Sequence, residues 1–142
     1  MKKQKGFTLI ELLVVISIIA ILTTLLMANF VGVRQRGRDG QRKSNLYNIQ
    51  SALELFRNDS GSYPYSGGTA FPACGSSLVY NSSTYMQTVP CDPLGGNYTY
   101  QSTDGITYTL YACLENESDS QKTAAPGSPT TICTTYFVLN QP

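Results

Sequence analysis

In this chain of 142 residues, the residue types best suited to chemistry are four cysteines, which can form disulfides or bind metal. They are widely spaced, no C-x-x-C pair occurs, and the chain contains no histidine, so the ligand spacing typical of a zinc site is absent. An even number of cysteines favours disulfides formed in an oxidising compartment, with reduced structural cysteines as the alternative. Four cysteines allow three pairings. Spacing alone does not decide between them, but we favour the two that close short intervals, Cys74–Cys91 and Cys113–Cys133.

The other reactive side chains do not form a catalytic set. Serines and threonines are abundant, but there is no histidine to serve as their base, and the cysteines have structural spacing. Glu115 and Glu117 could imitate a pair of glycosidase carboxylates, yet neighbouring acids are common in loops. The sequence therefore predicts a protein that is not an enzyme.

Glu11 is also of chemical interest, because it is the one acid near the start of a long apolar run. Residues 12–33 carry no charge, and as a helix they would be roughly 33 Å long, enough to span a bilayer. A carboxylate at the end of such a helix is costly in lipid and needs a partner, but no base lies on its helix face. If the chain were cut after Gly6, the new α-amine of Phe7 would lie one helical turn away and could neutralise Glu11.

Two simpler interpretations compete for the apolar run. A secretory signal peptide also has a basic start and an apolar centre, but this run is long for one, and the exit near Ala28 has Leu26 where a small residue is expected. A plain transmembrane anchor is the other interpretation, and it gives Glu11 no partner.

Beyond the apolar run, the sequence predicts a long helix that packs on a small antiparallel sheet, an α+β fold. A single helix from about Thr8 to Arg57 would be roughly 75 Å long. Asn58–Pro64 contains turn formers, Gly61 and a proline, which stop a helix. We expect the distal half to present an apolar stripe on which the head packs, although a groove for a partner helix is the alternative. The stripe consists of Leu46, Ile49, Leu53 and Phe56.

Three later stretches predict the strands of the head. Tyr98–Leu114 alternates around Asp104-Gly105 and indicates a hairpin. Leu78–Val89 is expected to hold one short turn or strand, and Thr130–Leu139 is the remaining strand candidate. Between the hairpin and that strand, residues 115–129 form a polar loop. One face of the hairpin should pack on the helical stripe, and its residues are Tyr108, Leu110, Ala112 and Leu114.

The stretch KGFTLIELLVVISIIAIL, residues 5–22, resembles the class III signal of type IV pilins and type II secretion pseudopilins. The resemblance implies that a prepilin peptidase cuts after Gly6 and methylates the new N-terminal Phe7. It also places the family's glutamate on Glu11, where it directs docking of a new subunit against its neighbour. The head adds two stretches similar to the pseudopilin pattern, NDSGSYP and VPCDPLGGNYTY, although the tryptophan of the second is Leu94 here.

This resemblance implies four segments: a cleaved leader (1–6), a transmembrane and assembly helix (7–33), an amphipathic half of that helix (34–61) and a β-rich head (62–142). The function it implies is that of a structural subunit of an extracytoplasmic helical filament. The two pseudopilin-like sequence stretches of the head favour a type II secretion pseudopilus, whereas disulfides favour a surface type IV pilus. The alternative is a single-span membrane-anchored binding protein that does not polymerise.

The implied location is the prokaryotic cytoplasmic membrane, crossed once, with the head outside the cytoplasm. The implied partners are membrane lipid, a prepilin peptidase, an inner-membrane assembly platform and further copies of the chain. Nucleic acid is not expected, because the bases lie beside the apolar run and the head is acidic. One rule opposes this topology: five bases follow the run and three precede it, which favours a cytoplasmic head. The leader and the cysteines outweigh that count.

The resemblance also suggests calcium as the one possible cofactor. Major pseudopilins bind calcium in the loop after their central strands, and calcium prefers oxygen ligands. A comparable stretch here contains Glu115, Glu117 and Asp119, although the glycine-rich motif of the family is absent. A solvated acidic loop is the alternative.

The family often carries a glycine and a helix-breaking proline around a stretch that melts on assembly. Alanines, Ala20 and Ala28, stand at those positions here. We therefore expect a continuous helix between them, with flexibility shifted to Gly32–Gly40, where glycines weaken a helix.

Overall fold

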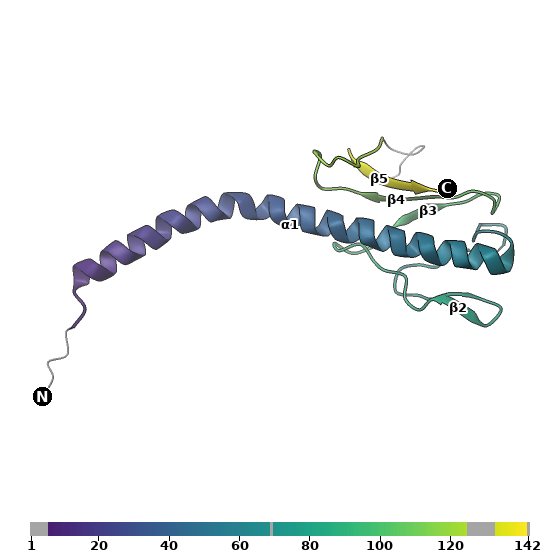
Figure 1. The fold of residues 1–142 in the computed structure, drawn as a ribbon, viewed down its shortest axis with the longest axis horizontal. Helices are drawn as coiled ribbons and strands as arrows, with labels where there is room; N and C mark the ends of the chain where they lie inside the picture. Colours follow the sequence, from purple (N-terminus) through teal and green to yellow (C-terminus); the bar gives the residue numbers. More distant parts are fainter. Residues whose placement is uncertain (1–5, 69, 125–132, 142) are drawn as a thin grey trace, which may run out of the picture. The chain divides into compact units, whose positions relative to one another are not determined.

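The computed structural model describes residues 6–68, 70–124 and 133–141. Within them the chain forms one long helix and a set of short strands, the predicted α+β layout (Figure 1). The chain divides into two compact units, Met1–Arg34 and Gln35–Pro142. The second unit is the head, and it contains the distal half of the helix together with all the described strands. The elements are α1 (Leu9–Ser60), β1 (Leu78–Tyr80), β2 (Ser83–Met86), β3 (Thr99–Gln101), β4 (Thr109–Cys113) and β5 (Tyr136–Asn140).

Helix α1 runs for 52 residues with a defined stop at its C-terminal end. Gly61 follows it in the left-handed conformation (φ 80°), and its N–H donates to the carbonyl of Arg57 at 2.8 Å. Only glycine adopts this backbone conformation without strain, which explains the end at this residue. The segment between Ala20 and Ala28 is helical in this chain, as predicted, and so is Gly32–Gly40. Whether either stretch changes on assembly stays a prediction.

A three-stranded antiparallel sheet with the order β3-β4-β5 forms the larger β element of the head. The predicted hairpin is confirmed by the β3–β4 pairing, in which Tyr100 lies opposite Leu110. Its connection, residues 102–108, is organised by Asp104, whose Oδ1 accepts hydrogen bonds from the N–H groups of Ile106 (2.9 Å) and Thr107 (3.1 Å). Gly105 supplies the positive φ of 69° that the turn requires.

Two strand predictions need correction. Leu78–Val89 holds two strands rather than one, because Asn81 and Ser82 adopt positive φ values (45° and 67°) and reverse the chain between β1 and β2. The last strand begins at Tyr136, later than predicted, since Tyr136 pairs with Cys113 at the end of β4 and the described residues just before it, 133–135, lie outside the ladder. The predicted residues 130–132 lie outside the described part of the chain.

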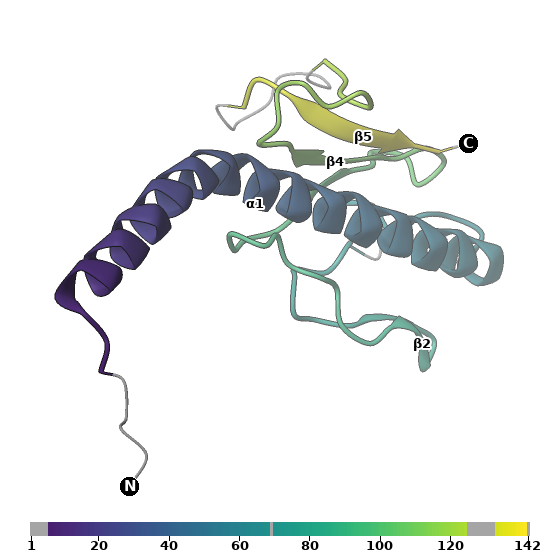
Figure 2. The same ribbon diagram turned by 60° about the vertical axis from the view of Figure 1, so that its left-hand side comes forward.

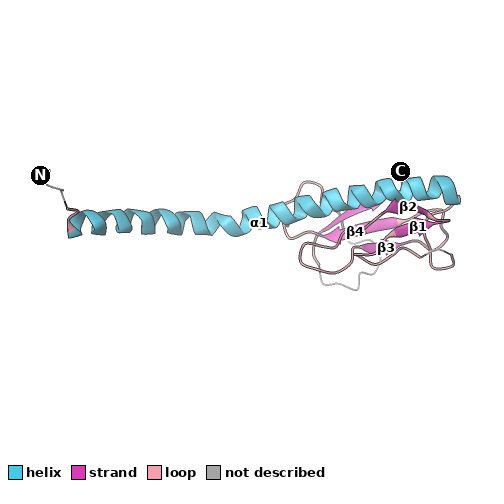
Figure 3. Cartoon of the chain, turned by 90° about the horizontal axis from the view of Figure 1, so that it is seen from below, coloured by secondary structure: helices cyan, strands magenta, loops and turns pink. Residues whose placement is uncertain are grey.

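The core of the head lies between the helical stripe and the strands. All four predicted stripe residues are at most 1% exposed, and the four residues predicted for the hairpin face are at most 4% exposed. Figures 1 and 2 show the three-stranded sheet and the β1–β2 hairpin on different sides of the distal half of α1, and Figure 3 shows the strands alongside that half. In Figure 3 the distal half of α1 runs along one side of the head, so one face packs on the strands and the other is exposed, which explains why this half is amphipathic.

Candidate functional site

Thr8 and Glu11 form a hydrogen-bonded pair at the start of α1. The N–H and hydroxyl of Thr8 donate to Oε2 of Glu11 at 2.8 and 2.7 Å, and the N–H of Glu11 donates to the Thr8 hydroxyl at 3.3 Å. This reciprocal arrangement is a capping box, which satisfies donors that a helix leaves free at its N-terminus. The Thr-x-x-Glu spacing that signals it is present in the sequence, but the sequence-based prediction considered only charged partners for Glu11.

Phe7 and Glu11 lie on the same side of the first turns. Together with Ile10, Val14 and Val15 they line an open hollow of about 340 Å³ whose exposed surface is apolar. None of the ion pairs among the described residues involves Glu11. The carboxylate therefore has a neutral partner within its own chain and no cationic one in the described residues.

The remainder of this unit is an apolar helix without internal cover. Leu9–Met27 has a mean hydropathy of 2.8, and none of it is buried within the chain. By length and composition this segment can cross a membrane. Neither a buried core helix nor a solvated surface helix has these properties together.

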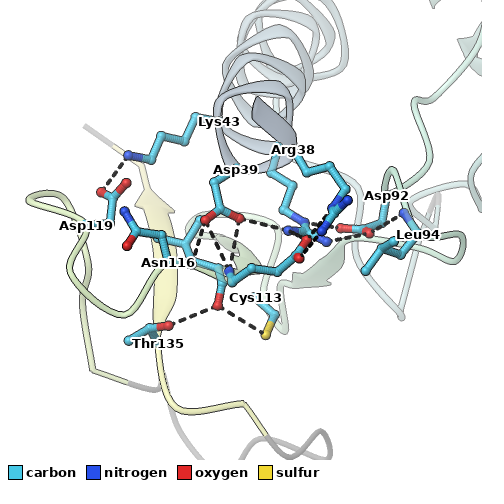
Figure 4. Close-up of polar contacts among 12 residues, drawn as sticks. Arg38, Asp39, Lys43, Asp92, Leu94, Cys113, Asn116, Asp119 and Thr135 are labelled. Carbon is cyan, nitrogen blue, oxygen red and sulfur yellow. Dashed lines mark hydrogen bonds and ion pairs between the residues drawn. The ribbon is translucent and has the colours of Figure 1, made fainter. Parts of the chain in front are cut away.

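The head contains a second polar site, the ionic cluster, in which cations of α1 meet acids of two loops (Figure 4). Its centre is Arg42, whose side chain is only 4% exposed. The guanidinium donates to Asp39 at 2.8 Å, to Asp92 at 2.6 and 3.0 Å, and to Glu115 at 2.6 Å. Arg38 forms a two-pronged pair with Glu115, and Lys43 contacts Asp119 at 2.6 Å. The cluster comprises Arg38, Asp39, Arg42, Lys43, Asp92, Glu115 and Asp119.

Asp39 holds the main chain of the loop that follows β4. Its carboxylate accepts hydrogen bonds from the N–H of Glu115, at 3.0 and 3.2 Å, and from the N–H of Asn116 at 2.8 Å. The carboxylate is almost fully buried, so these bonds replace the water that it loses. One helix acid thereby orients Arg42 on the same helix and ties the loop backbone to α1.

Ion pairing shifts the titration of the loop acids. The guanidinium of Arg38, together with that of Arg42, lowers the pKa of Glu115 to about 2, against desolvation that raises it. The ammonium of Lys43 and the N–H of Gln121 lower the pKa of Asp119. Hydrogen bonding to Asp92 raises the pKa of Arg42, with desolvation opposing it. Glu115, Asp119 and Arg42 therefore keep their charges at neutral pH.

The three acids predicted as calcium ligands do not converge on one point. Glu115 points to the two arginines, Asp119 to Lys43, and Oε1 of Glu117 accepts from the Thr134 hydroxyl at 3.3 Å. Among the described residues, no three acids, cysteines or histidines are placed to hold a metal ion.

Both favoured cysteine pairings are present. Cys74 is bonded to Cys91, with 4.9 Å between their Cα atoms, and Cys113 is bonded to Cys133, with 6.0 Å. The second disulfide joins the end of β4 to the approach to β5, and so closes the chain segment that contains Glu115 and Asp119.

A processing signal, an uncovered apolar helix with a capped glutamate, and a compact β-rich head on the same helix together define the pilin-like class of subunits. The sequence comparisons agree with this class. Residues 1–27 match the prokaryotic N-terminal methylation motif, and residues 29–125 match the family of type II secretion system protein G. The chain belongs to the type II secretion system protein G family.

Curated relatives come from several bacteria. The chain is 30% identical over 104 residues to the type II secretion system core protein G of Escherichia coli K12, covering 68% of this chain and 70% of that protein. It is 30% identical over 107 residues to the protein of the same name from Vibrio cholerae, covering 72% and 73%.

A relative named as a pilus component is also similar. The type IV wide pilus major component PilA4 of Thermus thermophilus is 43% identical over 63 residues, covering 44% of this chain and 48% of that protein. No solved structure matches the chain.

Proposed function

We propose that this chain is a structural subunit of the type II secretion pseudopilus, an extracytoplasmic helical filament. A prepilin peptidase cleaves it after Gly6 and methylates Phe7. The apolar half of α1 holds the subunit in the membrane as a single span, with the head outside the cytoplasm. An assembly platform then extracts it, and copies of the chain stack through their N-terminal helices. The role is structural rather than catalytic.

The observation that carries this proposal is the uncovered apolar half of α1. None of Leu9–Met27 is buried within the chain, so this surface needs an environment that the chain itself does not supply. Lipid can provide it before assembly, and the same helices of neighbouring subunits can provide it in a filament. A membrane anchor alone would need the lipid, but it would not need Glu11.

Glu11 is proposed to set the register of assembly. In the described chain, Thr8 satisfies this carboxylate locally. In the low-dielectric centre of a filament an ionised Glu11 still requires a positive partner, and the Phe7 amine created by cleavage is the nearest group able to supply one. A neighbour is then stable only where its amine reaches a Glu11, which is the use of buried charge best supported in other systems.

The ionic cluster also bears on the proposed topology. Three of the five bases that follow the apolar run, Arg38, Arg42 and Lys43, are paired with carboxylates of the head. Only Arg34 and Arg36 then remain to contact headgroups, against three lysines in the leader. The count of bases on the two sides of the apolar run is therefore a weaker argument for a cytoplasmic head than the sequence alone indicates.

A surface type IV pilus is the second candidate function. The two disulfides and the similarity to a pilus component from Thermus thermophilus favour it. The protein G family match and the two protein G relatives, which cover about 70% of the chain, favour the pseudopilus.

The test compares cells with and without the prepilin peptidase. Mass spectrometry of the chain extracted from membranes should show loss of residues 1–6 and a methyl group on Phe7 only where the peptidase is present. An intact N-terminus in both strains would contradict the proposal and favour a non-polymerising anchor. In a strain lacking this chain, loss of protein secretion would favour the pseudopilus, whereas intact secretion with loss of surface filaments would favour the pilus.

A further inference from the structure

The ionic cluster determines whether the acids of the head are available to bind a divalent cation. The acids of the loop after β4 are the residues that could hold a divalent cation, and the two nearest the helix already have cationic partners. Both carboxylate oxygens of Glu115 accept from guanidinium groups. Oδ1 of Asp119 accepts from Lys43 at 2.6 Å and from the N–H of Gln121 at 2.8 Å.

A calcium ion does not fit this arrangement. Calcium takes six to eight oxygen ligands at 2.3–2.6 Å, supplied by carboxylates, carbonyls and water. An ion beside Glu115 would lie within a few ångströms of the arginines that contact the same oxygens, and like charges at that distance repel each other. An ion beside Asp119 would lie within a few ångströms of the Lys43 ammonium, which donates to Oδ1 at 2.6 Å, and would be repelled by it.

The cations of the helix instead connect three separate parts of the head. Arg42 joins α1 to the turn that contains Asp92 and to the start of the loop at Glu115. Lys43 joins α1 to Asp119, four residues further along the loop. We infer that Arg38, Arg42 and Lys43 fasten this loop to α1 in the place of a divalent cation, so that the head folds without calcium and depends on the ionic cluster.

Arg42 is the most buried cation of the ionic cluster, so its loss should destabilise the head more than the loss of Arg38 or Lys43. Its side chain is 4% exposed, and those of Asp39 and Asp92 are 2% and 17% exposed. Removing Arg42 would leave three carboxylates close together without their shared cation. Breaking a buried pair from one side is far more damaging than the net value of the pair, because the remaining charge loses both water and partner.

The experiment measures thermal unfolding of the full chain in detergent micelles, by the near-ultraviolet circular dichroism of its tyrosines. Unfolding of the wild-type chain should have the same midpoint in calcium chloride and in EGTA. Arg42→Gln should lower the midpoint by roughly 10 °C in both buffers. The control is Arg36→Gln, an exposed arginine of the same helix outside every ion pair of the described residues, and it should leave the midpoint unchanged.

A wild-type midpoint that rises with calcium chloride and falls in EGTA would overturn the inference. If Arg42→Gln does not fold, Arg38→Gln and Lys43→Gln replace it, because both side chains are partly exposed and each removes one pair. A fall of a few degrees in either variant supports the inference, whereas unchanged midpoints in both would refute it. The measurement uses unassembled subunits, so its outcome is independent of whether the chain forms filaments.

Discussion

Helix α1 passes through two regions that treat similar side chains in opposite ways. Between Leu9 and Met27 its large apolar side chains are 45–85% exposed. Between Leu46 and Phe56, by contrast, the residues of its apolar stripe are at most 1% exposed. Charge follows the same division: Glu11 has a local, neutral partner in Thr8, whereas Arg42 has three carboxylates from different parts of the head.

The difference separates assembly from folding. A helix that is apolar on every side has no stable place in water, so its environment must come from lipid or from other chains. The distal half obtains its environment from the strands of its own chain. Changes in the first region should therefore alter filaments and leave head stability intact, and changes in the second should do the reverse.

The largest expected effect is on assembly, from Glu11→Val. We expect normal cleavage after Gly6 but at least a tenfold loss of filaments, since a preference of only about 1.4 kcal/mol per subunit changes occupancy tenfold. Electron microscopy of filaments, together with the mass of the mature chain, measures this. Ile10→Val, which keeps the run apolar, is the control and should assemble normally. Full incorporation of the Glu11→Val chain would remove the proposed register role.

The next effect is on folding, from Leu53→Ala in the stripe. Leu53 is fully buried, so the cavity should reduce the free energy of unfolding by about 2–5 kcal/mol. Its neighbour Leu55 is 60% exposed, and Leu55→Ala should change that free energy by less than about 0.5 kcal/mol. Chemical denaturation in detergent gives both values. Equal losses for the two variants would contradict the assignment of the stripe as the core face.

A loss in the lower part of the same range should follow replacement of Cys113 and Cys133 by serine. A disulfide that closes a loop of this length contributes about 3 kcal/mol, largely by restricting the unfolded chain. The double variant should unfold earlier in denaturant. Adding a reductant should destabilise it less than it destabilises the wild type, because the wild type loses both disulfides and the variant loses only Cys74–Cys91. A double variant as stable as the wild type would show that the ionic cluster alone holds the loop.

The smallest effect is expected from acid. The pKa of Glu115 is about 2 in the folded head, beside Arg38 and Arg42, and near 4.5 when the chain is unfolded. Because the folded value is the lower one, this contribution is complete above pH 4.5 and is lost as the pH falls towards 2. The unfolding midpoint should decline over that interval. Glu115→Gln should be less stable at neutral pH and should show a shallower decline; an identical decline would assign the acid sensitivity to other groups.

Much of the architecture could be predicted from local patterns. The spacing of Leu46, Ile49 and Leu53 specifies an apolar helix face, and Gly61 specifies where that helix ends, because each depends on residues a few positions apart. The β3–β4 hairpin followed from alternation around Asp104-Gly105 for the same reason. The two errors, a single strand in Leu78–Val89 and an early start for β5, concern short strands whose limits depend on what they pair with.

The candidate sites divide in the same way. The predictions for Gly6, Phe7 and Glu11 rest on a local motif that the sequence alone displays. Spacing favoured the two cysteine pairs without deciding between the three possible pairings, and the structure shows both favoured pairs. The ionic cluster could not be predicted from the sequence, since Arg42 lies 50 residues from Asp92 and 73 from Glu115 along the chain. Only the folded head brings these side chains together. The sequence determined which residues are charged and where the helix runs, and the tertiary structure decided that the loop acids meet the helix cations.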